Sequence, residues 1–562
     1  MAIIGIDLGT TYSLVGCCVD GTVRLIPNAL QQFLTPSVIG ADTDGTIIAG
    51  SIARQRLVTH PQETVADFKQ FMGTGKTWKL GGRTVYAEDL SSLLLRQLKE
   101  DAERFLGEEV TEAVVSVPAY FDNNQRAATK AAGKLAGLHV ERIVNEPSAA
   151  ALQYAHAHNL DGTFLVIDLG GGTLDISVVD VFDNVVDILA VAGHNHLGGI
   201  HFDECIVREF LRRHPELTDL SEPETASLRG LAEKAKRGLT DAEETMLLFH
   251  RDGNTYSMML TEKQLAVLTA PLLEEIKATM KKALRDSRRS IDQFQDVLLI
   301  GGSTKMPLIR KYIAYITGRE PVSDENPDLA VVRGVALVSG IKARQEAFRD
   351  TVLTDICPFT LGVGVRGPDI NTQLMSPIIE RNSSLPISRE NLYASVADNQ
   401  QDIQIQIYQG EALDTQSNLL LGSLHMELPP LPAGEAQICI RFTYDINGIL
   451  EIDATCLNNG CKAHTFIVQN KSLSEDEIAK RLEDMQKLKL SPGDEPVNRL
   501  LMETAKRLFM QLMGPARERL VTEMALFGEA IESKNISDVR KAQERFQRVL
   551  NQLDQFDDGL QE

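Results

Sequence analysis

Two short segments of the chain place an aspartate before a turn rich in glycine and threonine. The first reads IDLGTTYS (residues 6–13) and the second reads IDLGGGTLDIS (residues 167–177). Glycine has no side chain, so the backbone N–H groups of such turns can approach an anion closely, and the threonine hydroxyls add further donors. The pair of turns therefore predicts a grip on a polyphosphate from two sides, with donors from Gly9, Thr10, Thr11, Gly170, Gly171, Gly172 and Thr173.

The two aspartates, Asp7 and Asp168, would face the same phosphate charge, which is unfavourable for a carboxylate unless a cation lies between them. Mg²⁺ binds one or two carboxylates together with phosphates and waters. Either turn alone is also compatible with an ordinary β-turn. Two matching turns instead favour a duplicated, two-lobed fold that holds Mg-nucleotide in its cleft. A third glycine turn, Gly301-Gly302, follows another apolar segment and could admit a flat ring.

Apolar segments that alternate with helical patterns must position these turns. AIIGID (2–7), AVVSVPAYF (113–121), TFLVIDLGGG (163–172) and DVLLIGGST (296–304) have the composition of strands, and NQRAATKAAGKLAGL (124–138) has the pattern of a helix. This alternation is typical of α/β layers. We therefore predict an α/β domain over residues 1–348.

The pattern changes to period two after about residue 356. Ile403, Ile405 and Ile407 alternate with glutamines in DIQIQIYQGE (402–411), and AQICIRFTYDINGILEIDATC (436–456) has the pattern of two strands joined at Asn447-Gly448. Such alternation indicates an antiparallel sheet with one packed face and one solvated face. We predict an antiparallel β-sandwich over residues 357–470.

A helical region is predicted over residues 471–562. A capping box, Ser474-x-x-Glu477, opens it, and Gly514-Pro515 interrupts it. Residues 349–356 form a linker between the first two domains. Its aliphatic residues Val352 and Leu353 indicate either a segment that docks or the end of a buried strand.

The composition excludes some classes of partner. The 562 residues include 57 Lys and Arg and 78 Asp and Glu, a formal net charge of −21. This charge disfavours nucleic acid and anionic lipid as partners. No apolar run approaches the roughly 18 residues of a membrane helix, and no export signal is recognised. The seven scattered cysteines fit a reducing cytoplasm, so we expect a cytoplasmic protein without membrane insertion.

Three further patterns do not predict sites. GTGKT (73–77) lacks the upstream glycine and the preceding strand of a P-loop. HNHLGGIH (194–201) holds three histidines but no acidic or thiol ligand nearby. Cys456, Cys461 and His464 have spacing that suggests zinc, but a fourth ligand is missing.

A family resemblance rests on motifs that occur in order along the chain. They are GIDLGTTYS, VVSVPAYFDNNQRAATKAAG, RIVNEPSAAALQY, IDLGGGTLDIS, HLGGIHFD, GGSTKMP and NPDLAVVRGVAL, followed by ERNSSLPISR, VADNQQDIQIQIYQGE and YDINGILEIDA. The chain resembles the heat-shock protein 70 (DnaK-type) chaperones of the actin and hexokinase superfamily, and within them most resembles the specialised bacterial HscC branch. The resemblance covers residues 1 to about 470 closely and the remainder in pattern.

The resemblance implies a multidomain protein with an actin/hexokinase-like, two-lobed α/β ATPase, an antiparallel β-sandwich that binds peptide, and a C-terminal helical lid. It implies an ATP-dependent chaperone with ATP/ADP and Mg²⁺ as cofactors. Unfolded or extended polypeptides and a dedicated J-domain co-chaperone would be its partners. In this scheme ATP closes the lobes and docks the linker, and hydrolysis reverses both.

The resemblance also assigns roles in hydrolysis. Asp7 and Asp168 would orient waters on Mg²⁺, and Lys69 would contact the γ-phosphate and the attacking water. Glu146, Thr173 and Asp175 would complete the catalytic set with Lys69 and Asp168. The nucleotide would further contact Gly9, Thr10, Thr11, Tyr12, Gly170, Gly171, Gly172, Thr173, Gly198, Gly199, Glu233, Lys236, Arg237, Thr240, Gly301, Gly302, Ser303, Lys305 and Asp328.

The residues alone leave some of these roles open. Lys69 is also compatible with a solvated surface lysine, and Glu146 with a carboxylate at a helix start. Glu233, Lys236 and Arg237 have the i, i+3, i+4 spacing of one helix face, which also suits a surface ion-pair ladder.

The remaining implied roles concern communication and peptide binding. Pro118 and Arg126 match the switch between nucleotide states, and Arg142 and Asn145 match part of the surface that receives J-domain proteins. The apolar peptide cleft would include Met375, Val396, Ile403 and Ile405.

Several positions depart from the family pattern. Lys305 stands where arginine is usual, and Ile200 replaces an acid. The stretches after Gly73 and within 240–262 are shorter than in DnaK. We therefore expect weaker nucleotide retention, no dependence on the usual exchange factor and a narrow set of clients.

Two other functions share the phosphate turns: a metabolite kinase and an actin-like filament ATPase. Neither needs a β-domain and a helical end joined by an aliphatic linker, which favours the chaperone.

Overall fold

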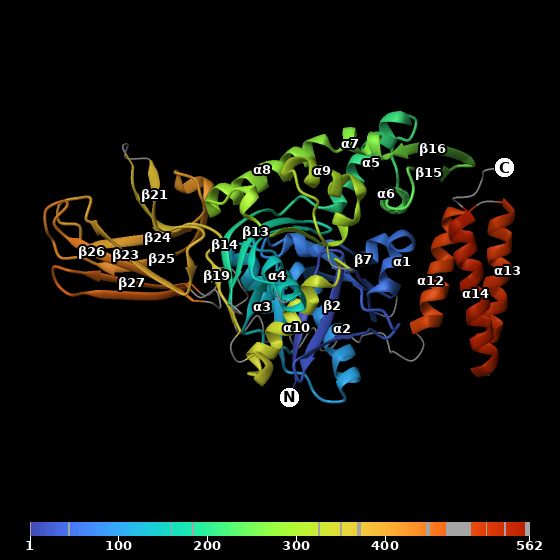
Figure 1. Cartoon of the computed structure of the whole chain (residues 1–562), viewed down its shortest axis with the longest axis horizontal. Helices are drawn as coiled ribbons and strands as arrows, with labels where there is room; N and C mark the ends of the chain where they lie inside the picture. Colours follow the sequence, from blue (N-terminus) through green and yellow to red (C-terminus); the bar gives the residue numbers. More distant parts are fainter. Residues whose placement is uncertain are drawn as a thin grey trace.

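The structure is a computed structural model that describes residues 2–42, 45–158, 160–182, 185–323, 326–348, 351–367, 372–445, 450–467, 496–512, 514–532 and 536–556. The predicted Asn447-Gly448 turn and the capping box at Ser474 and Glu477 lie outside these residues. Figure 1 shows an α/β body in the centre, a β-sandwich at one end and a bundle of helices at the opposite end. None of the described helices is both long and apolar enough to span a bilayer.

The two halves of the α/β body repeat one strand pattern around the two glycine turns. In each half a central strand ends at its turn, pairs antiparallel with the next strand and pairs parallel with a later strand. This repeat explains why the aspartate-glycine motif occurs twice. The strands are β1 (Ile3–Leu8), β2 (Tyr12–Val19) and β10 (Glu112–Val117) in the first lobe, and β12 (Gly162–Leu169), β13 (Leu174–Phe182) and β17 (Asp296–Ile300) in the second.

Additional strands extend both sheets, and two helices pack between them. The first sheet has the order β11-β10-β1-β2-β3 with β4 beside β2, and the second has the order β17-β12-β13-β14-β18. A methyl group on Gly334 would lie 1.8 Å from the carbonyl oxygen of Ala149, so the two helices cross closely where glycine is required. These elements are β3 (Thr22–Ile26), β4 (Thr35–Pro36), β11 (Ile143–Asn145), β14 (Val185–His194), β18 (Val352–Leu353), α4 (Glu146–His158) and α10 (Ala330–Lys342).

The outer part of the first lobe covers its sheet with helices. Asp122 begins α3 with a reciprocal cap, because its Oδ1 accepts from Gln125 N (2.9 Å) while Gln125 Oε1 accepts from Asp122 N (3.0 Å). The elements are β5 (Ile39–Ala41), β6 (Ile47–Ala49), α1 (Ser51–Thr59), η1 (Pro61–Glu63), β7 (Thr64–Val65), η2 (Phe68–Phe71), β8 (Thr77–Leu80), β9 (Arg83–Tyr86), α2 (Ala87–Leu106) and α3 (Asn123–Leu135).

The outer part of the second lobe has its own apolar core, in which Phe202, Phe210 and Phe249 are buried. Amphipathic spacing on the helices supplies this core, as expected for helices that pack on one face. The elements are α5 (Gly199–Arg213), α6 (Glu222–Gly238), β15 (Glu244–Arg251), β16 (Asn254–Thr261), α7 (Glu262–Leu268), α8 (Ala270–Ser287), η3 (Ile291–Gln293), η4 (Gly302–Lys305), α9 (Pro307–Thr317) and η5 (Glu346–Phe348).

The β-sandwich consists of two four-stranded antiparallel sheets, β21-β20-β24-β25 and β23-β26-β27-β28, with a short pair β19-β22. Ile405 and Ile407 are buried and Ile403 is half-buried, so the predicted alternation is confirmed. The elements are β19 (Asp355–Ile356), β20 (Leu361–Arg366), β21 (Gln373–Ile379), β22 (Ser384–Leu385), β23 (Ile387–Ala394), β24 (Asp402–Gln409), η6 (Thr415–Ser417), β25 (Leu419–Glu427), β26 (Gln437–Tyr444), β27 (Leu450–Cys456) and β28 (Lys462–Ile467).

The helical bundle contains α12 (Pro496–Gln511), α13 (Gly514–Glu532) and α14 (Ile536–Phe556). Leu508, Phe527 and Phe546 are buried in its core. The α13 helix begins at Gly514, at the break that Gly514-Pro515 predicted. The bundle packs on the first lobe and lies far from the β-sandwich (Figure 1).

Candidate active site

A cluster of buried carboxylates lies where the central strands of both lobes end. Asp168 on β12 is directly opposite Asp175 on β13, and Asp7 on β1 is opposite Ser116 on β10. The Ser116 hydroxyl donates to Asp7 Oδ1 (2.8 Å), and the backbone N–H of Tyr120 donates to Asp175 Oδ1 (3.0 Å). The charge of Asp7 acts on Asp168, so the aspartates of the two motifs lie in one site.

The carboxylates resist ionisation in the absence of a cation. Burial, reinforced by the charge of Glu146, raises the pKa of Asp7 to about 7 and that of Asp175 to about 7. Burial and the charges of Glu146, Asp175 and Asp7 raise the pKa of Asp168 well above its ordinary value. A divalent cation would relieve this repulsion, since it favours the charged form of each acid. The residues therefore fit Mg²⁺.

Lys69 is a buried member of this site. Its Nζ donates to Glu146 Oε1 at 2.7 Å, and both side chains are shielded from solvent. Lys69 comes from η2 and Glu146 from the first turn of α4, so the ion pair joins segments 77 residues apart. The alternative of a solvated surface lysine is therefore wrong.

The two glycine turns are in direct contact. A methyl group on Gly171 would lie 1.8 Å from Thr11 Oγ1, and one on Gly172 would lie 3.0 Å from Thr10 Cγ2. The Gly199 N–H donates to the carbonyl oxygen of Gly170 (3.0 Å), which brings the Gly198-Gly199 segment beside the same turn. Gly9, Thr173 and these residues surround one small region.

A buried donor in this region has no protein partner among the described residues. Gln70 Nε2 lies 2.3 Å from where a methyl group on Gly172 would be, next to the glycine turn. Buried polar atoms are normally hydrogen-bonded, so an orphan donor indicates a group supplied from elsewhere. An anionic oxygen held by the turn is a suitable acceptor, and Gln70 was not predicted from the sequence.

The third glycine turn lies beside the second. The Ser303 hydroxyl donates to the carbonyl oxygen of Gly170 (2.8 Å), and Gly301 passes so close to Asp168 that a methyl group would contact its Oδ1 at 2.5 Å. Lys305 forms an ion pair with Asp328, and Asp328 also faces Gly302. The predicted ring side of the cleft is therefore assembled in the second lobe.

The predicted nucleotide-binding residues of helix α6 differ in where they lie, and only some of them face the cleft. Lys236 is buried and donates to the carbonyl oxygen of Gly199 (2.8 Å) and to Asp203 Oδ2 (3.0 Å). Glu233 reaches across to the first lobe, whereas Arg237 and Thr240 are exposed. The surface-ladder alternative is correct only for the 3.7 Å pair between Arg237 and Glu233.

Arg54 on α1 connects the two lobes across the mouth of the cleft. Its guanidinium donates to Glu233 Oε2 (2.7 Å) in the second lobe and to the Tyr12 hydroxyl (2.6 Å) in the first. This residue was not predicted, because no motif in SIARQRLVT marks it and its partner is 179 residues away.

Residues predicted for the nucleotide switch and the J-domain surface are hydrogen-bonded to one another and to the linker. Arg126 donates to the carbonyl oxygens of Ala119 and Phe121 and to Asn145 Oδ1 (2.7 Å). Asn145 Nδ2 then donates to Asp355 Oδ1 (2.6 Å). Pro118 begins the turn, since its carbonyl oxygen accepts from Phe121 N (3.1 Å).

The linker is docked on the second lobe as an additional strand. Val352 and Leu353 pair in parallel with Val185 and Val186 of β14. The Arg142 guanidinium approaches the carbonyl oxygen of Leu353 at 3.5 Å. The linker thus lies against Arg142, which is half-buried, and against Asn145, which is buried and so is not itself part of an accessible surface in this structure.

The β-sandwich contacts both lobes through polar groups. Arg381 forms a bidentate pair with Asp286 on α8 (2.9 and 3.1 Å) and also pairs with Glu411 (2.8 Å). Asn123 at the start of α3 donates its N–H to Gln409 Oε1 (3.1 Å) and accepts from the Tyr444 hydroxyl (2.9 Å). These contacts link the sandwich to the segment that follows Tyr120.

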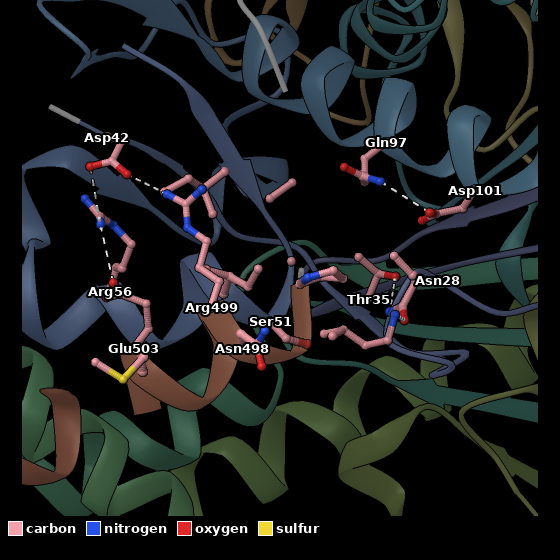
Figure 2. Close-up of a pocket in the computed structure, with 18 of the residues that line it drawn as sticks. Asn28, Thr35, Asp42, Ser51, Arg56, Gln97, Asp101, Asn498, Arg499 and Glu503 are labelled. Atoms are coloured by element: carbon pink, nitrogen blue, oxygen red, sulfur yellow. Dashed lines mark hydrogen bonds and ion pairs between the residues drawn. The ribbon is translucent and has the colours of Figure 1, made fainter. Parts of the chain in front are cut away.

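The bundle packs on the first lobe through a mixed interface. Figure 2 shows Arg56 of α1 between Asp42 and Glu503, with Arg499 of α12 bonded to the same Asp42 (2.5 Å). Leu500 packs against an apolar cluster of that lobe. A pocket of about 680 Å³ lies in this interface rather than in the nucleotide cleft. The helices are therefore held on the α/β body and away from the sandwich.

The predicted peptide residues differ in exposure. Met375 and Ile405 are buried, Ile403 is half-buried and Val396 is exposed. The backbone N–H of Met375 donates to the carbonyl oxygen of Leu413 (2.9 Å), and the Leu413 side chain is 72% exposed. Leu413 was not predicted, since it stands alone in a polar loop.

Comparison with known proteins gives one consistent result. The model of the Hsp70 protein family matches residues 3–80 and 76–558. Curated chaperone proteins DnaK from Thermotoga petrophila and Thermotoga maritima are 37% identical over 503 residues, which cover 86% of this chain and 83% of theirs. DnaK from Thermosipho melanesiensis is 38% identical over the same shares. Members of this family are ATPases that bind ATP and ADP with a divalent metal, and the chain belongs to the Hsp70 family of chaperones.

Proposed function

We propose that Mg-ATP bound between the two lobes controls the binding and release of extended polypeptide by the β-sandwich. The observation that carries this proposal is a continuous set of hydrogen bonds from the cleft to the linker. Asp175 accepts from Tyr120, Arg126 bonds the neighbouring carbonyls and Asn145, and Asn145 bonds Asp355. A shift of the carboxylates when nucleotide binds would therefore reach the linker through Tyr120, Arg126 and Asn145.

Each part of the cleft has a distinct role in this proposal. Asp7 and Asp168 would hold Mg²⁺ through waters, and the two glycine turns would hold the phosphates. ATP would supply the phosphoanhydride bond that water breaks. Lys69, held by Glu146, stabilises negative charge in a buried site, where such a cation is most effective. Arg54 and Glu233 hold the lobes together.

The proposed cycle makes use of the observed domain arrangement. With the linker paired to β14 and the bundle on the first lobe, none of the described helices α12, α13 and α14 covers the sandwich, which suits rapid peptide exchange. Release of these contacts after hydrolysis would let the bundle act as a lid. We propose the ATPase domain as residues 1–348, the linker as 349–356, the sandwich as 357–470 and the lid as 471–562.

The partners follow from the same surfaces. A J-domain co-chaperone would bind at the half-buried Arg142, whose guanidinium approaches the linker carbonyl of Leu353, and the buried Asn145 would pass the effect to Asp355. Independence from the usual exchange factor remains our proposal, supported by the departures at Ile200 and Lys305. The HscC branch and a narrow client set are further proposals that these two residues do not test.

The proposal is tested by ATP turnover with and without an unfolded peptide. Stimulation by peptide supports it, and phosphate transfer to a small acceptor would support a metabolite kinase instead. Arg381→Ala is expected to reduce the stimulation at least about tenfold, because it removes the bidentate partner of the buried Asp286 and weakens sandwich docking. The control is Arg389→Ala, because Arg389 is an exposed arginine of the same domain whose guanidinium donates to the neighbouring carbonyl oxygen of Ser388. Unchanged stimulation in Arg381→Ala would contradict the docking role.

Nucleotide retention is expected to depend on Arg54. Arg54→Ala should release ADP about three- to tenfold faster, since it removes a half-exposed ion pair worth about 1 kcal/mol across the cleft. Stopped-flow release of a fluorescent ADP analogue measures the rate. Lys311→Ala is the matched control, because the Lys311–Glu262 pair lies within the second lobe. Equal release rates for Arg54→Ala and the unmodified protein would refute the bridging role.

A further inference from the structure

The strand alternation in the last hairpin separates the residues of the zinc-like sequence pattern. Cys456 is buried, and Cys461 packs against the same core of the sandwich. His464 lies on the opposite, solvent-facing side of β28. The two thiols and the imidazole therefore do not form one site.

His464 instead lies beside two carboxylates on the outer face of the sheet. It is directly opposite Asp453 in the β27–β28 register, and Glu451 is the next residue along that face of β27. His464 Nε2 is 3.0 Å from Glu451 Oε1 and 3.9 Å from Asp453 Oδ1. One ligand atom from each residue lies within 4.8 Å of the others.

We propose that Glu451, Asp453 and His464 bind a divalent transition metal of the Zn²⁺ class. Two carboxylates and one imidazole are ligands of this class, and the imidazole disfavours Mg²⁺, which prefers oxygen. The three side chains are partly exposed, so water can complete the coordination. No other cluster of this kind occurs in the part of the chain that the structure describes.

A neighbouring arginine orients one of the ligands. Arg441 on β26 donates to Asp453 Oδ2 (3.1 Å) and leaves Oδ1 directed at His464. Hydrogen bonds of this kind commonly fix metal-bound carboxylates in proteins. The ion would join β27 to β28, the last strand before the helical region, and so would restrain that strand.

The test is a calorimetric titration of the metal-free, nucleotide-free full-length protein with Zn²⁺ alone, repeated with Co²⁺ and followed by absorption. One equivalent is expected to bind without a thiolate-to-cobalt band. His464→Ala and Asp453→Asn are each expected to weaken binding at least about tenfold. The control is His425→Ala, because His425 on β25 of the same sandwich faces a single carboxylate, Asp402, at 3.5 Å.

The outcomes separate this site from other donors of the chain. Thermal unfolding of the metal-free variants should match that of the unmodified protein, which confirms that weaker binding is a loss of ligands. Absence of binding, a thiolate-to-cobalt band, or binding that survives His464→Ala but is lost with His194→Ala would overturn the proposal.

Discussion

Replacing Lys69 by methionine is expected to slow ATP hydrolysis about 100- to 1000-fold while the protein stays folded. The Lys69 ammonium lies 2.7 Å from Glu146 in a site that contains three more buried carboxylates. The positive charge of Lys69 partly offsets the negative charge of these carboxylates, since it lowers the pKa of both Asp7 and Asp175. Methionine has a side chain of similar length but no charge. The slower hydrolysis would therefore report the loss of charge stabilisation at the reacting phosphate.

Single-turnover hydrolysis measures this effect separately from nucleotide release. Lys79→Met is the control, because Lys79 is an exposed lysine of the same lobe whose ammonium donates to the Thr84 hydroxyl. Circular dichroism and thermal unfolding establish that the Lys69 variant is folded. A single-turnover rate within about threefold of the unmodified protein would show that Lys69 is structural.

The second large effect is expected from Gly171→Ala. The added methyl group would overlap Thr11 Oγ1, at 1.8 Å, so the two glycine turns could no longer meet across the cleft. The lobes would remain apart, and we expect ATP affinity to fall at least about 100-fold, corresponding to about 2.7 kcal/mol. Adding Thr11→Ala should bring the affinity closer to that of the Thr11→Ala single variant, because it removes Oγ1, the closest contact of the methyl group, and leaves Thr11 Cβ, at 3.0 Å, as the nearest atom.

The matched control for this substitution is Gly230→Ala on α6. No atom lies within 4 Å of the position that its methyl group would occupy. Alanine within a helix is expected to stabilise the protein by about 0.5–1 kcal/mol without changing ATP affinity. Calorimetric titration with ATP compares the variants, and unchanged affinity in Gly171→Ala would show that contact of the turns is not needed for binding.

The sequence was sufficient for features that depend on local pattern. The repeated aspartate-glycine turns predicted the two-lobed duplication, and the alternation of Ile403, Ile405 and Ile407 predicted a half-buried strand. Strand identity follows from such patterns because side chains alternate between the two faces of a sheet.

Residues joined only by tertiary structure were not predictable in this way. Arg54 and Glu233 are 179 residues apart, and Arg381 and Asp286 are 95 residues apart, and no motif joins the two partners of either pair. Ser116 could be identified as the partner of Asp7 only after the parallel register of β1 and β10 was known. Long-range pairing is set by the packing of whole elements, which one sequence does not reveal.

The cysteines near the end of the sandwich show a different problem, in which the sequence groups residues that the structure separates. Their spacing relative to His464 resembles a zinc pattern, but spacing takes no account of which face of the strand each residue occupies. The same alternation that buries Cys456 places His464 beside Asp453. The ligands of the proposed metal site are therefore determined by strand register.

The most direct measurement of nucleotide control is the rate at which a bound fluorescent peptide dissociates, compared between saturating Mg-ATP and Mg-ADP. Control of the sandwich by the cleft predicts release roughly 100-fold faster with ATP, which corresponds to an activation free energy of dissociation lower by about 2.7 kcal/mol. Equal dissociation rates with the two nucleotides would contradict it.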